Sequence, residues 1–241
     1  MNTLWQWVGL ISIGAGGSFM LYESWEAFAW WRLVDKTPTV SIARVHNQLA
    51  EVTGSTVEGE ALLVSPINRI ECVFYRTTIQ EWKGSGKSGR WETAHQEASQ
   101  DPIYIEDGTG RARILPQSAT TEFEKDFERF SGALKGDAFP AKVKTYLHQV
   151  GVESSAFLGL HPRLRCEEIF IRPGEQLYVL GWGTKKDDLV EFAAQGPETF
   201  IISDFSEKKL RAKYRKEMWE NLLFGIFLVV VFAVLASTLM G

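Results

Sequence analysis

The stretch ECVFYRTTIQEW, residues 71–82, decides the fold class of the central region because it is rich in β-branched and aromatic residues. Its side chains alternate, which predicts a strand with one face carrying Val73, Tyr75, Thr77 and Ile79. The flexible sequence KGSGKSG follows, and residues 90–95 return as a second strand. This order predicts a β-hairpin.

Further strand signals surround this hairpin. Residues 51–64 read as one bent strand or a pair of strands, and residues 199–202 as the last strand. Residues 103–105 and 111–115 flank an Asp-Gly turn, which predicts a second hairpin. Residues 168–171 and 176–181 are two more strands, separated by Pro-Gly. The residues expected to form these turns are Asp107, Gly108, Gly110, Pro173 and Gly174.

Two helices are expected in the same region. Phe123, Phe127 and Phe130 recur at helical spacing, which predicts a helix there. Residues 140–150 are a second helix, because Pro140 suits a first helical turn and Gly151 suits the position just past the end.

Strands therefore dominate, and the predicted fold class is a β-rich α+β protein. Short strands with regular turn signals favour a small, partly closed β-barrel or a sandwich. This domain is expected at residues 34–206, between an N-terminal transmembrane helix with its flank at 1–33 and a basic stem with a C-terminal transmembrane helix at 207–241.

Both chain ends are apolar and uncharged over lengths that could cross a bilayer. The first apolar stretch is 4–22, and the second is LLFGIFLVVVFAVLASTLM at 222–240. A cleaved signal peptide would need a basic start, which residues 1–3 lack. Tryptophans gather at the expected water–lipid boundaries, at Trp5, Trp7, Trp25, Trp30, Trp31 and Trp219. The small residues Gly14, Gly16 and Gly17 could allow this helix to pack closely against a partner helix. Such packing could also form a homo-oligomer.

Basic residues flank both spans on the side of the central region. Arg32, Lys36 and Arg44 follow the first span, and the stretch before the second contains Lys208, Lys209, Arg211, Lys213, Arg215 and Lys216. The positive-inside rule therefore predicts a cytosolic central domain with both termini outside. The second stretch is either a plain topology signal or a site for anionic lipid, worth about 1 kcal/mol per residue. It is expected to continue the membrane helix into water as a stem.

Composition and motifs exclude several function classes. The 241 residues carry a net charge of −4, which gives no support for nucleic-acid binding. The GSGKSG sequence lacks the glycine that a P-loop needs five residues earlier. Cys72 and Cys166 cannot form a disulfide framework, and Cys166 near His161 lacks zinc-ligand spacing. The chain has no GxSxG sequence. The scattered histidines His46, His95, His148 and His161 do not indicate catalysis. No catalytic residue, metal site or cofactor is predicted.

The end of the first hairpin is the strongest candidate for partner binding. Aromatic and basic side chains gather there, at Trp82, Lys83, Lys87, Arg90 and Trp91. Such a cluster could bind a peptide, a protein partner or a lipid surface. The simpler alternative is cross-strand tryptophan packing on a solvated hairpin.

The order of these segments resembles the prokaryotic GIDE family, whose domain is also called BAM, for "beside a membrane". The resemblance rests on DKTPT (35–39), LAEVTG (49–54), SPINRIECVFYRTTIQEW (65–82), PIYIEDGTGRARI (102–114) and EEIFIRPGEQLYVLG (167–181). The family pattern has a glycine between Pro66 and Cys72, where this chain has Asn68, Arg69 and Ile70.

The resemblance implies a domain bracketed by two membrane helices, as in the membrane part of the related mitochondrial E3 ubiquitin ligase. In that family, ligase activity comes from a RING finger, which needs four ligands for each of two zinc ions. This chain has 2 Cys and 4 His. The leading hypothesis is thus a non-enzymatic, membrane-anchored binding module that recruits a protein or peptide partner. The alternatives are a ligase-like component whose RING another chain supplies, and a protein that responds to anionic lipid.

Overall fold

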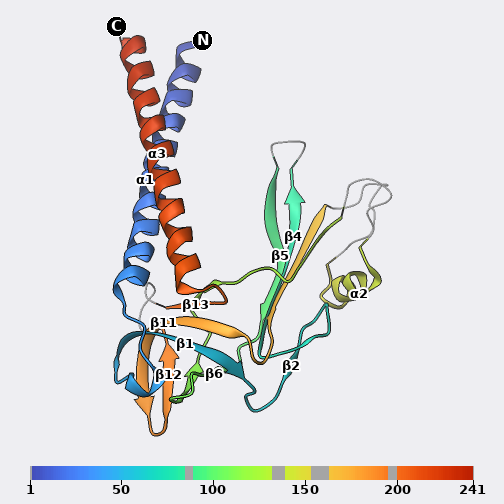
Figure 1. The fold of residues 1–241 in the computed structure, drawn as a ribbon. Helices are drawn as coiled ribbons and strands as arrows, with labels where there is room; N and C mark the ends of the chain where they lie inside the picture. The colour runs from blue at the N-terminus through green and yellow to red at the C-terminus, as the bar shows by residue number, and fades with distance from the viewer. Residues whose placement is uncertain (1, 85–88, 132–138, 153–162, 195–199, 241) are drawn as a thin grey trace. The chain divides into compact units, whose positions relative to one another are not determined.

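The computed structural model describes residues 2–84, 89–131, 139–152, 163–194 and 200–240 (Figure 1). The chain divides into two compact units. A helical unit combines Met1–Pro38 with Ser206–Gly241, and a β-rich unit spans Thr39–Phe205. Each unit is described by itself below.

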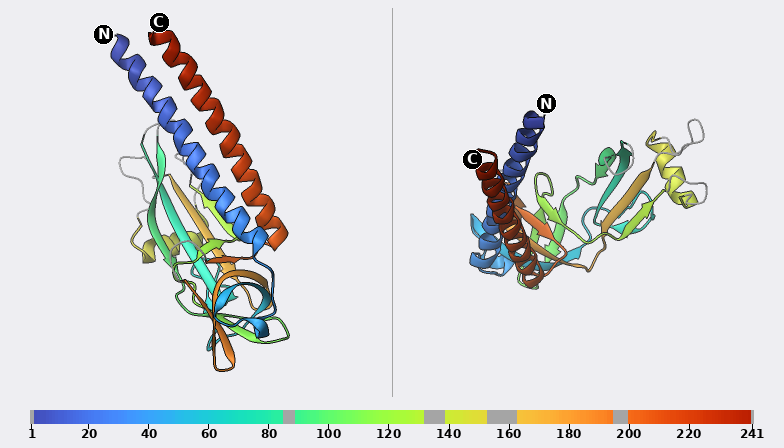
Figure 2. Two further views of the ribbon diagram at one scale, coloured as in Figure 1. Left: turned by 90° about the vertical axis from the view of Figure 1, so that its left-hand side faces the viewer. Right: turned by 90° about the horizontal axis from the view of Figure 1, so that it is seen from above.

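The helical unit is an antiparallel pair of long helices, α1 (Asn2–Lys36) and α3 (Glu207–Met240) (Figure 2). The direction is shown by the contacts between the helices, in which residues later in α1 meet residues earlier in α3. These contacts join Gly17 to Val229, Ser24 to Met218, Trp30 to Tyr214, and Asp35 to Arg211. The Ser24 hydroxyl donates a hydrogen bond to the Met218 carbonyl at 2.9 Å.

Glycines let the two helices approach closely. A Cβ built on Gly225 would lie 2.9 Å from a methyl carbon of Leu21, and one on Gly17 would lie 3.0 Å from Val229. Gly14 faces the Phe232 ring in the same way. Two of the three glycines expected to support helix packing therefore do so within this chain, against α3.

Among the described residues, α3 is long and apolar enough to cross a membrane. The candidate helix is Glu207–Leu239, in which an 18-residue window has a mean hydropathy of 2.8. The basic stretch is the first part of this same helix, so the prediction of a continuous helical stem is confirmed.

The β-rich unit is built on a closed five-stranded barrel. Its strands are β1 (Gln48–Val57), β6 (Ile103–Glu106), β7 (Arg111–Ile114), β12 (Leu189–Ala193) and β11 (Gln176–Lys186), in that order. The barrel closes because β1 also pairs with β11, from Gln48 opposite Gly183 to Ser55 opposite Gln176. All five pairings are antiparallel except that between β7 and β12. The predicted barrel is thus confirmed over the sandwich.

Numbered along the chain, the barrel strands follow the order 1-2-3-5-4-1, with the third and fifth parallel. This is the strand order of the OB-type barrel. Alternate side chains fill the interior, including Val52, Ile105, Ile114, Val179 and Phe192. Outside the barrel, β13 (Ile201–Ser203) pairs with β11, and β8 (Thr120–Glu122) pairs with β13.

A second sheet is assembled from two insertions between barrel strands. Its order is β5 (Arg90–Ala98), β4 (Phe74–Lys83), β10 (Leu164–Ile171), β9 (Phe127–Phe130). A short pair, β2 (Leu63–Val64) and β3 (Glu71–Cys72), precedes β4, and a 3₁₀ turn at Ile42–Arg44 precedes β1. The predicted hairpins β4–β5 and β6–β7 are both confirmed.

Helix α2 (Ala141–Gln149) supplies the second core. Pro140 stands at its N-cap, and Gly151 follows it with φ +70°, as the sequence predicts. Its buried side chains Val143, Tyr146 and Leu147 form one cluster with residues of the four-stranded sheet, including Ile79, Leu164 and Cys166.

Two predictions about the local structure need correction. The helix expected from Phe123, Phe127 and Phe130 is wrong, because residues 127–130 form β9 and pair with β10 in register from Phe127 to Phe130. Strand pairing overrides the helical spacing of these side chains. Residues 51–64 contain two strands, but β2 pairs with β3 and not with β1. Strands β8, β9 and β12 were not predicted.

Candidate functional site

The predicted binding residues at the end of the β4–β5 hairpin include a tryptophan pair. Trp82 and Trp91 are register partners on neighbouring strands, and their rings meet edge to face at 5.3 Å. Such a pair contributes about 0.5–1.5 kcal/mol beyond area burial. The cross-strand packing anticipated from the sequence is therefore present.

A third ring extends this pair across the sheet. Phe130, on β9, lies 6.0 Å from Trp91 and is 51% exposed. Trp82, Trp91 and Phe130 are called the aromatic cluster below. Guanidinium groups lie over its ends, since Arg163 is 5.2 Å from the Trp82 ring and Arg165 is 5.4 Å from the Phe130 ring.

The basic side chains at the hairpin end are paired with acids two residues away. Lys83 contacts Glu81 at 2.6 Å, and Arg90 contacts Glu92 at 2.6 Å. Because the two basic side chains are 52% and 82% exposed, these pairs are worth about 1 kcal/mol or less each. Both cations therefore remain available to another anion. Lys87 lies outside the described residues.

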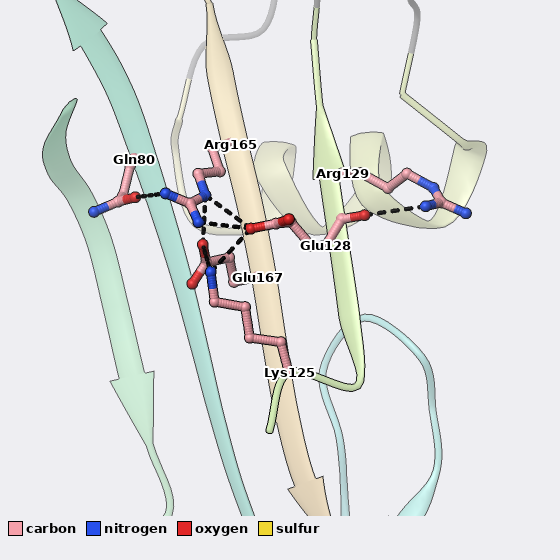
Figure 3. A network of polar contacts seen from close by, with 6 residues as sticks. All are labelled: Gln80, Lys125, Glu128, Arg129, Arg165 and Glu167. Atoms are coloured by element: carbon pink, nitrogen blue, oxygen red, sulfur yellow. Dashed lines mark hydrogen bonds and ion pairs between the residues drawn. The ribbon is translucent and has the colours of Figure 1, made fainter. Parts of the chain in front are cut away.

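Next to the aromatic cluster lies an ion-pair quartet formed by Lys125, Glu128, Arg165 and Glu167 (Figure 3). Lys125 Nζ contacts Glu128 at 2.9 Å and Glu167 at 2.7 Å. Arg165 contacts Glu128 at 2.6 Å and also pairs with Glu167 and Gln80. Cross-strand register brings these residues together, since Glu167 of β10 stands opposite Glu128 of β9.

The quartet changes the acidity of its members. Hydrogen bonds from Lys125 and Arg165 lower the pKa of Glu128 to about 2, against the smaller opposing effect of burial. Burial acts to lower the pKa of Lys125, but its hydrogen bonds to Glu167 and Glu128 raise it overall. Glu128 and Lys125 are thus both charged at neutral pH. The sequence analysis missed this quartet, although Arg165 and Glu167 have the i, i+2 spacing of one strand face.

The thiols are poorly suited to nucleophilic or metal chemistry. Cys72 and Cys166 are both free and buried. Burial raises the pKa of Cys72 to about 11 and that of Cys166 to about 12. At neutral pH both are protonated, and the thiolate is the reactive form. Across the described ranges, no group of three or more His, Cys, Asp and Glu could hold a metal ion. His161 falls outside those ranges.

A buried carboxylate organises the loop before β3. Glu168 accepts hydrogen bonds from the backbone N–H of Ile67 at 2.7 Å and of Asn68 at 3.0 Å, and from Ser65 Oγ at 3.3 Å. The loop bends at Arg69, whose φ is +58°. This chain therefore makes a left-handed bend at a non-glycine residue in the stretch where the family pattern has a glycine.

The expected turn residues occupy two different kinds of connection. Asp107 accepts hydrogen bonds from the N–H groups of Thr109 at 2.8 Å, Gly110 at 3.1 Å and Ile42 at 2.8 Å. These bonds outweigh burial and lower the pKa of Asp107. Gly108 has φ +80° in this hairpin turn. Pro173 and Gly174, the latter at φ +87°, instead join β10 of the four-stranded sheet to β11 of the barrel.

A small pocket lies on the outer side of the barrel. It measures about 220 Å³ and is lined by Gly59, Glu60, Tyr104, Arg111 and Leu189. The Arg111 guanidinium lies 4.6 Å from the Tyr104 ring centroid and donates to the Glu58 carbonyl at 2.7 Å. This arrangement holds Arg111 in place.

Several basic stem residues of α3 pair with acidic side chains. Arg211 contacts Asp35 of α1 at 3.4 Å, Lys213 contacts Glu217 at 3.9 Å, and Lys216 contacts Glu220 at 3.7 Å. The stem residues whose side chains are exposed are Lys208, Lys209, Arg215 and Lys216.

An apolar helix joined to a β-barrel unit defines a class of membrane-associated protein with a folded extramembrane domain. Within that class the chain belongs to the GIDE family, whose model, described as "E3 Ubiquitin ligase", matches residues 74–239. The family resemblance inferred from the sequence is confirmed. No curated protein and no solved structure matches the chain.

Proposed function

We propose that this chain is a membrane-anchored binding module in which two helices hold the β-rich unit beside the bilayer, where it recruits a protein partner. The observation that carries the proposal is the antiparallel pairing of α1 with α3. Tethering raises the effective concentration of any partner on the same membrane, so a weak site suffices.

Pairing gives α1 a place in the membrane beside α3. Residues 2–22 of α1 and 221–240 of α3 contain no charged side chain. The uncharged stretch of α1 ends, and that of α3 begins, next to the Ser24–Met218 hydrogen bond. Glu23 and Glu220 lie at this boundary. About 20 helical residues cover the ~30 Å hydrocarbon core. Apolar side chains such as Ile11, 63% exposed, and Phe19, 56% exposed, face outward from α1 and would meet lipid.

The boundary of this pair has the features of a water–lipid interface. Trp25 of α1 and Trp219 of α3 are both exposed there. The basic residues Arg32 and Lys36 lie at the same end of the pair as the basic stem of α3. By the positive-inside rule, the β-rich unit is cytosolic and both termini are outside.

The anchor is tested with single cysteines placed at Thr3 and at Ser237 of the full-length protein in sealed vesicles or cells. Two spans predict that a membrane-impermeant thiol reagent reaches both positions from the same side, opposite to that of Lys208→Cys. Labelling of Thr3→Cys from the same side as Lys208→Cys would leave α3 as the only span.

Partner recruitment is assigned to the sheet face that carries Phe130 and Arg165. Trp and Arg are enriched among residues that dominate binding energy, and both occur here beside an exposed Phe. Phe130 and Val64 are the two exposed large apolar side chains found in the described parts of the β-rich unit. Val64, 43% exposed, therefore serves as the matched control.

The test replaces Phe130 or Val64 with a photo-crosslinking amino acid in cells. A protein adduct should form at 130 and disappear when Arg165→Ala is added, while position 64 gives none. Equal adducts at both positions, or none at 130, would remove the sheet face from the proposal.

The family description favours a second candidate, a component of a ubiquitin-ligase system. The chain would then position a RING supplied by another chain. Addition of the purified protein to an activating enzyme, a conjugating enzyme and a RING protein should raise conjugate formation. An unchanged rate would dismiss this candidate.

The exposed stem lysines favour a third candidate, a protein that responds to anionic lipid. Four carboxylates, of Glu23, Glu26, Glu217 and Glu220, stand close to the same boundary and oppose it. Activity or conformation that is unchanged between neutral and anionic vesicles would rule it out.

A further inference from the structure

The outer face of three barrel strands carries side chains that the barrel core does not use. Alternation along β7 and β12 buries Ala112 and Val190 inside the barrel, where they are 0% and 4% exposed. Their neighbours Arg111 and Leu189 therefore face outward, as does Tyr104 of β6. These three side chains line the pocket of about 220 Å³, together with two residues that follow β1.

The pocket combines neighbouring strands with the loops beside them. Tyr104 and Arg111 belong to the second and third barrel strands, Gly59 and Glu60 follow the first strand, and Leu189 begins the fifth. In OB-type barrels, ligands built from repeated units bind on this strand face and on these loops. The volume is smaller than the ~300–1,000 Å³ of pockets that enclose a whole drug-sized ligand. The pocket therefore suits one unit of a longer ligand that continues along the strands.

Arg111 is held in position without a ligand. Its guanidinium carbon lies 4.6 Å from the Tyr104 ring centroid, and one N–H group donates to the Glu58 carbonyl at 2.7 Å. That bond, which is the one Arg111 makes among the described residues, uses one of its five N–H groups. The side chain is 41% exposed. Other donors of a positioned guanidinium can thus bind a ligand at a reduced entropic cost.

The charges around the pocket argue against a nucleic acid. Arg111 Nε lies 3.7 Å from the Glu106 carboxylate, and Arg113 lies 3.5 Å from Glu191 on the same strand face. The pocket and the adjoining ion pairs contain three acids and three bases, which are Glu60, Glu106, Glu191, Arg111, Arg113 and Lys186. A polyanion needs a surplus of cations. A ligand without net charge fits this balance better.

The lining also argues against a peptide anchor. Such anchors bury an aromatic or aliphatic side chain in an apolar pocket. Among the described lining residues Leu189 is the one aliphatic side chain, and the Arg111 guanidinium lies over Tyr104. Sugars have the complementary chemistry, because each hydroxyl both donates and accepts a hydrogen bond. One sugar unit can donate to the Glu60 carboxylate and accept from Arg111 at the same time.

We infer that this pocket binds one unit of a neutral oligosaccharide, with Arg111 as donor and Glu60 as acceptor. Neighbouring units lie along β7 beside Arg113. The site is on the barrel and is separate from the sheet face to which the proposed function assigns a protein partner. It is independent of how the chain is anchored.

Saturation-transfer NMR on the full-length protein tests this inference. The protein is held in lipid nanodiscs, because detergents with sugar headgroups would compete for the site, and empty nanodiscs give the background. The probes are maltotetraose, cellotetraose and chitotetraose, with a single-stranded oligothymidylate as the competing class. At least one tetrasaccharide should bind with a Kd of about 1 mM or tighter, and the oligothymidylate should not displace it.

Two variants locate the binding. Arg111→Ala should weaken it tenfold or more, because hydrogen bonds from a charged donor are lost. Glu60→Gln should weaken it about threefold, and since Glu60 is exposed this variant keeps the fold even if the first does not. Arg172→Ala is the matched control, because Arg172 is 51% exposed and lies 4.8 Å from the Phe170 ring but does not line the pocket. Its affinity should equal that of the wild type.

Three results would overturn the inference. They are no saturation transfer to any of the three tetrasaccharides, an affinity that is unchanged in both pocket variants, and displacement of the sugar by the oligothymidylate. None of them touches the proposed function, which is tested by cysteine labelling at the helix ends and by crosslinking at position 130.

Discussion

The barrel and the four-stranded sheet of the β-rich unit are made from alternating segments of one chain, yet they differ in closure. Every barrel strand has a partner on both sides, and the interior is an apolar cluster. The sheet has two edge strands, β5 and β9, and buries the carboxylate of Glu168. It also carries the aromatic cluster and the quartet. Closure thus supplies the scaffold, and the open sheet is the part to which the proposed function assigns binding.

The largest expected effect separates these two roles. Phe192 is fully buried inside the barrel, and Phe192→Ala should cost about 3–5 kcal/mol because a closed barrel cannot collapse around the cavity. Ile79→Ala, equally buried in the sheet, should cost about 2–5 kcal/mol. Hydrogen exchange should show lost protection throughout the unit for the first variant and mainly in β4, β10 and α2 for the second. Equal loss in β1 and β11 for both variants would make the two sheets one cooperative unit.

The next largest effect concerns the buried carboxylate of the sheet. Glu168→Ala leaves the N–H groups of Ile67 and Asn68 without their acceptor, and unpaired buried donors cost about 1–3 kcal/mol each. A loss of about 3 kcal/mol in the free energy of unfolding is expected by denaturant titration. Glu128→Gln, on the half-exposed side of the neighbouring strand, is the control and should cost about 1 kcal/mol or less. Similar losses for both would mean that the loop finds other acceptors.

A smaller effect appears in the pH dependence of the quartet. The folded-state pKa of Glu128, about 2, lies below its ordinary value of 4.5. Its contribution to stability is therefore complete above pH 4.5 and is lost as the pH falls toward 2. Because Glu128 is about one-third exposed, screening limits this contribution to about 1 kcal/mol. Denaturation midpoints of the wild type should fall more between pH 6 and pH 3 than those of Glu128→Gln. Parallel pH profiles would show that the quartet adds no stability.

Local sequence patterns predict the strands and turns of both regions better than their pairing. Alternation in residues 71–82, the Asp-Gly turn, and the Pro140 and Gly151 boundaries of α2 are all readable from neighbours in the chain. The closure of the barrel cannot be predicted from local sequence, because it depends on distant residues. Val52 of β1 pairs with Val179 of β11 across two long insertions. Phe127 and Phe130 mislead for the same reason, since their strand forms only through pairing with β10.

The same distinction applies to the candidate binding surfaces. Trp82 and Trp91 are joined by one hairpin, so the sequence predicts that they meet. Phe130 and the quartet depend on the register of β9 against β10, which no local pattern specifies. Surfaces that span several strands are therefore visible only once the sheet is known.

The smallest effect tests the bend that the sheet's loop makes without glycine. Arg69 adopts φ +58°, a left-handed conformation that costs a non-glycine residue about 1 kcal/mol. Arg69→Gly removes this strain but adds freedom to the unfolded chain, so a net gain of about 0.5 kcal/mol in the free energy of unfolding is expected. Arg69→Ala isolates the backbone term, because it removes the same side chain and keeps the strained φ. If alanine matches glycine in denaturant titrations, then the hydrogen bonds to Glu168, and not the backbone preference at 69, determine the stability of this loop.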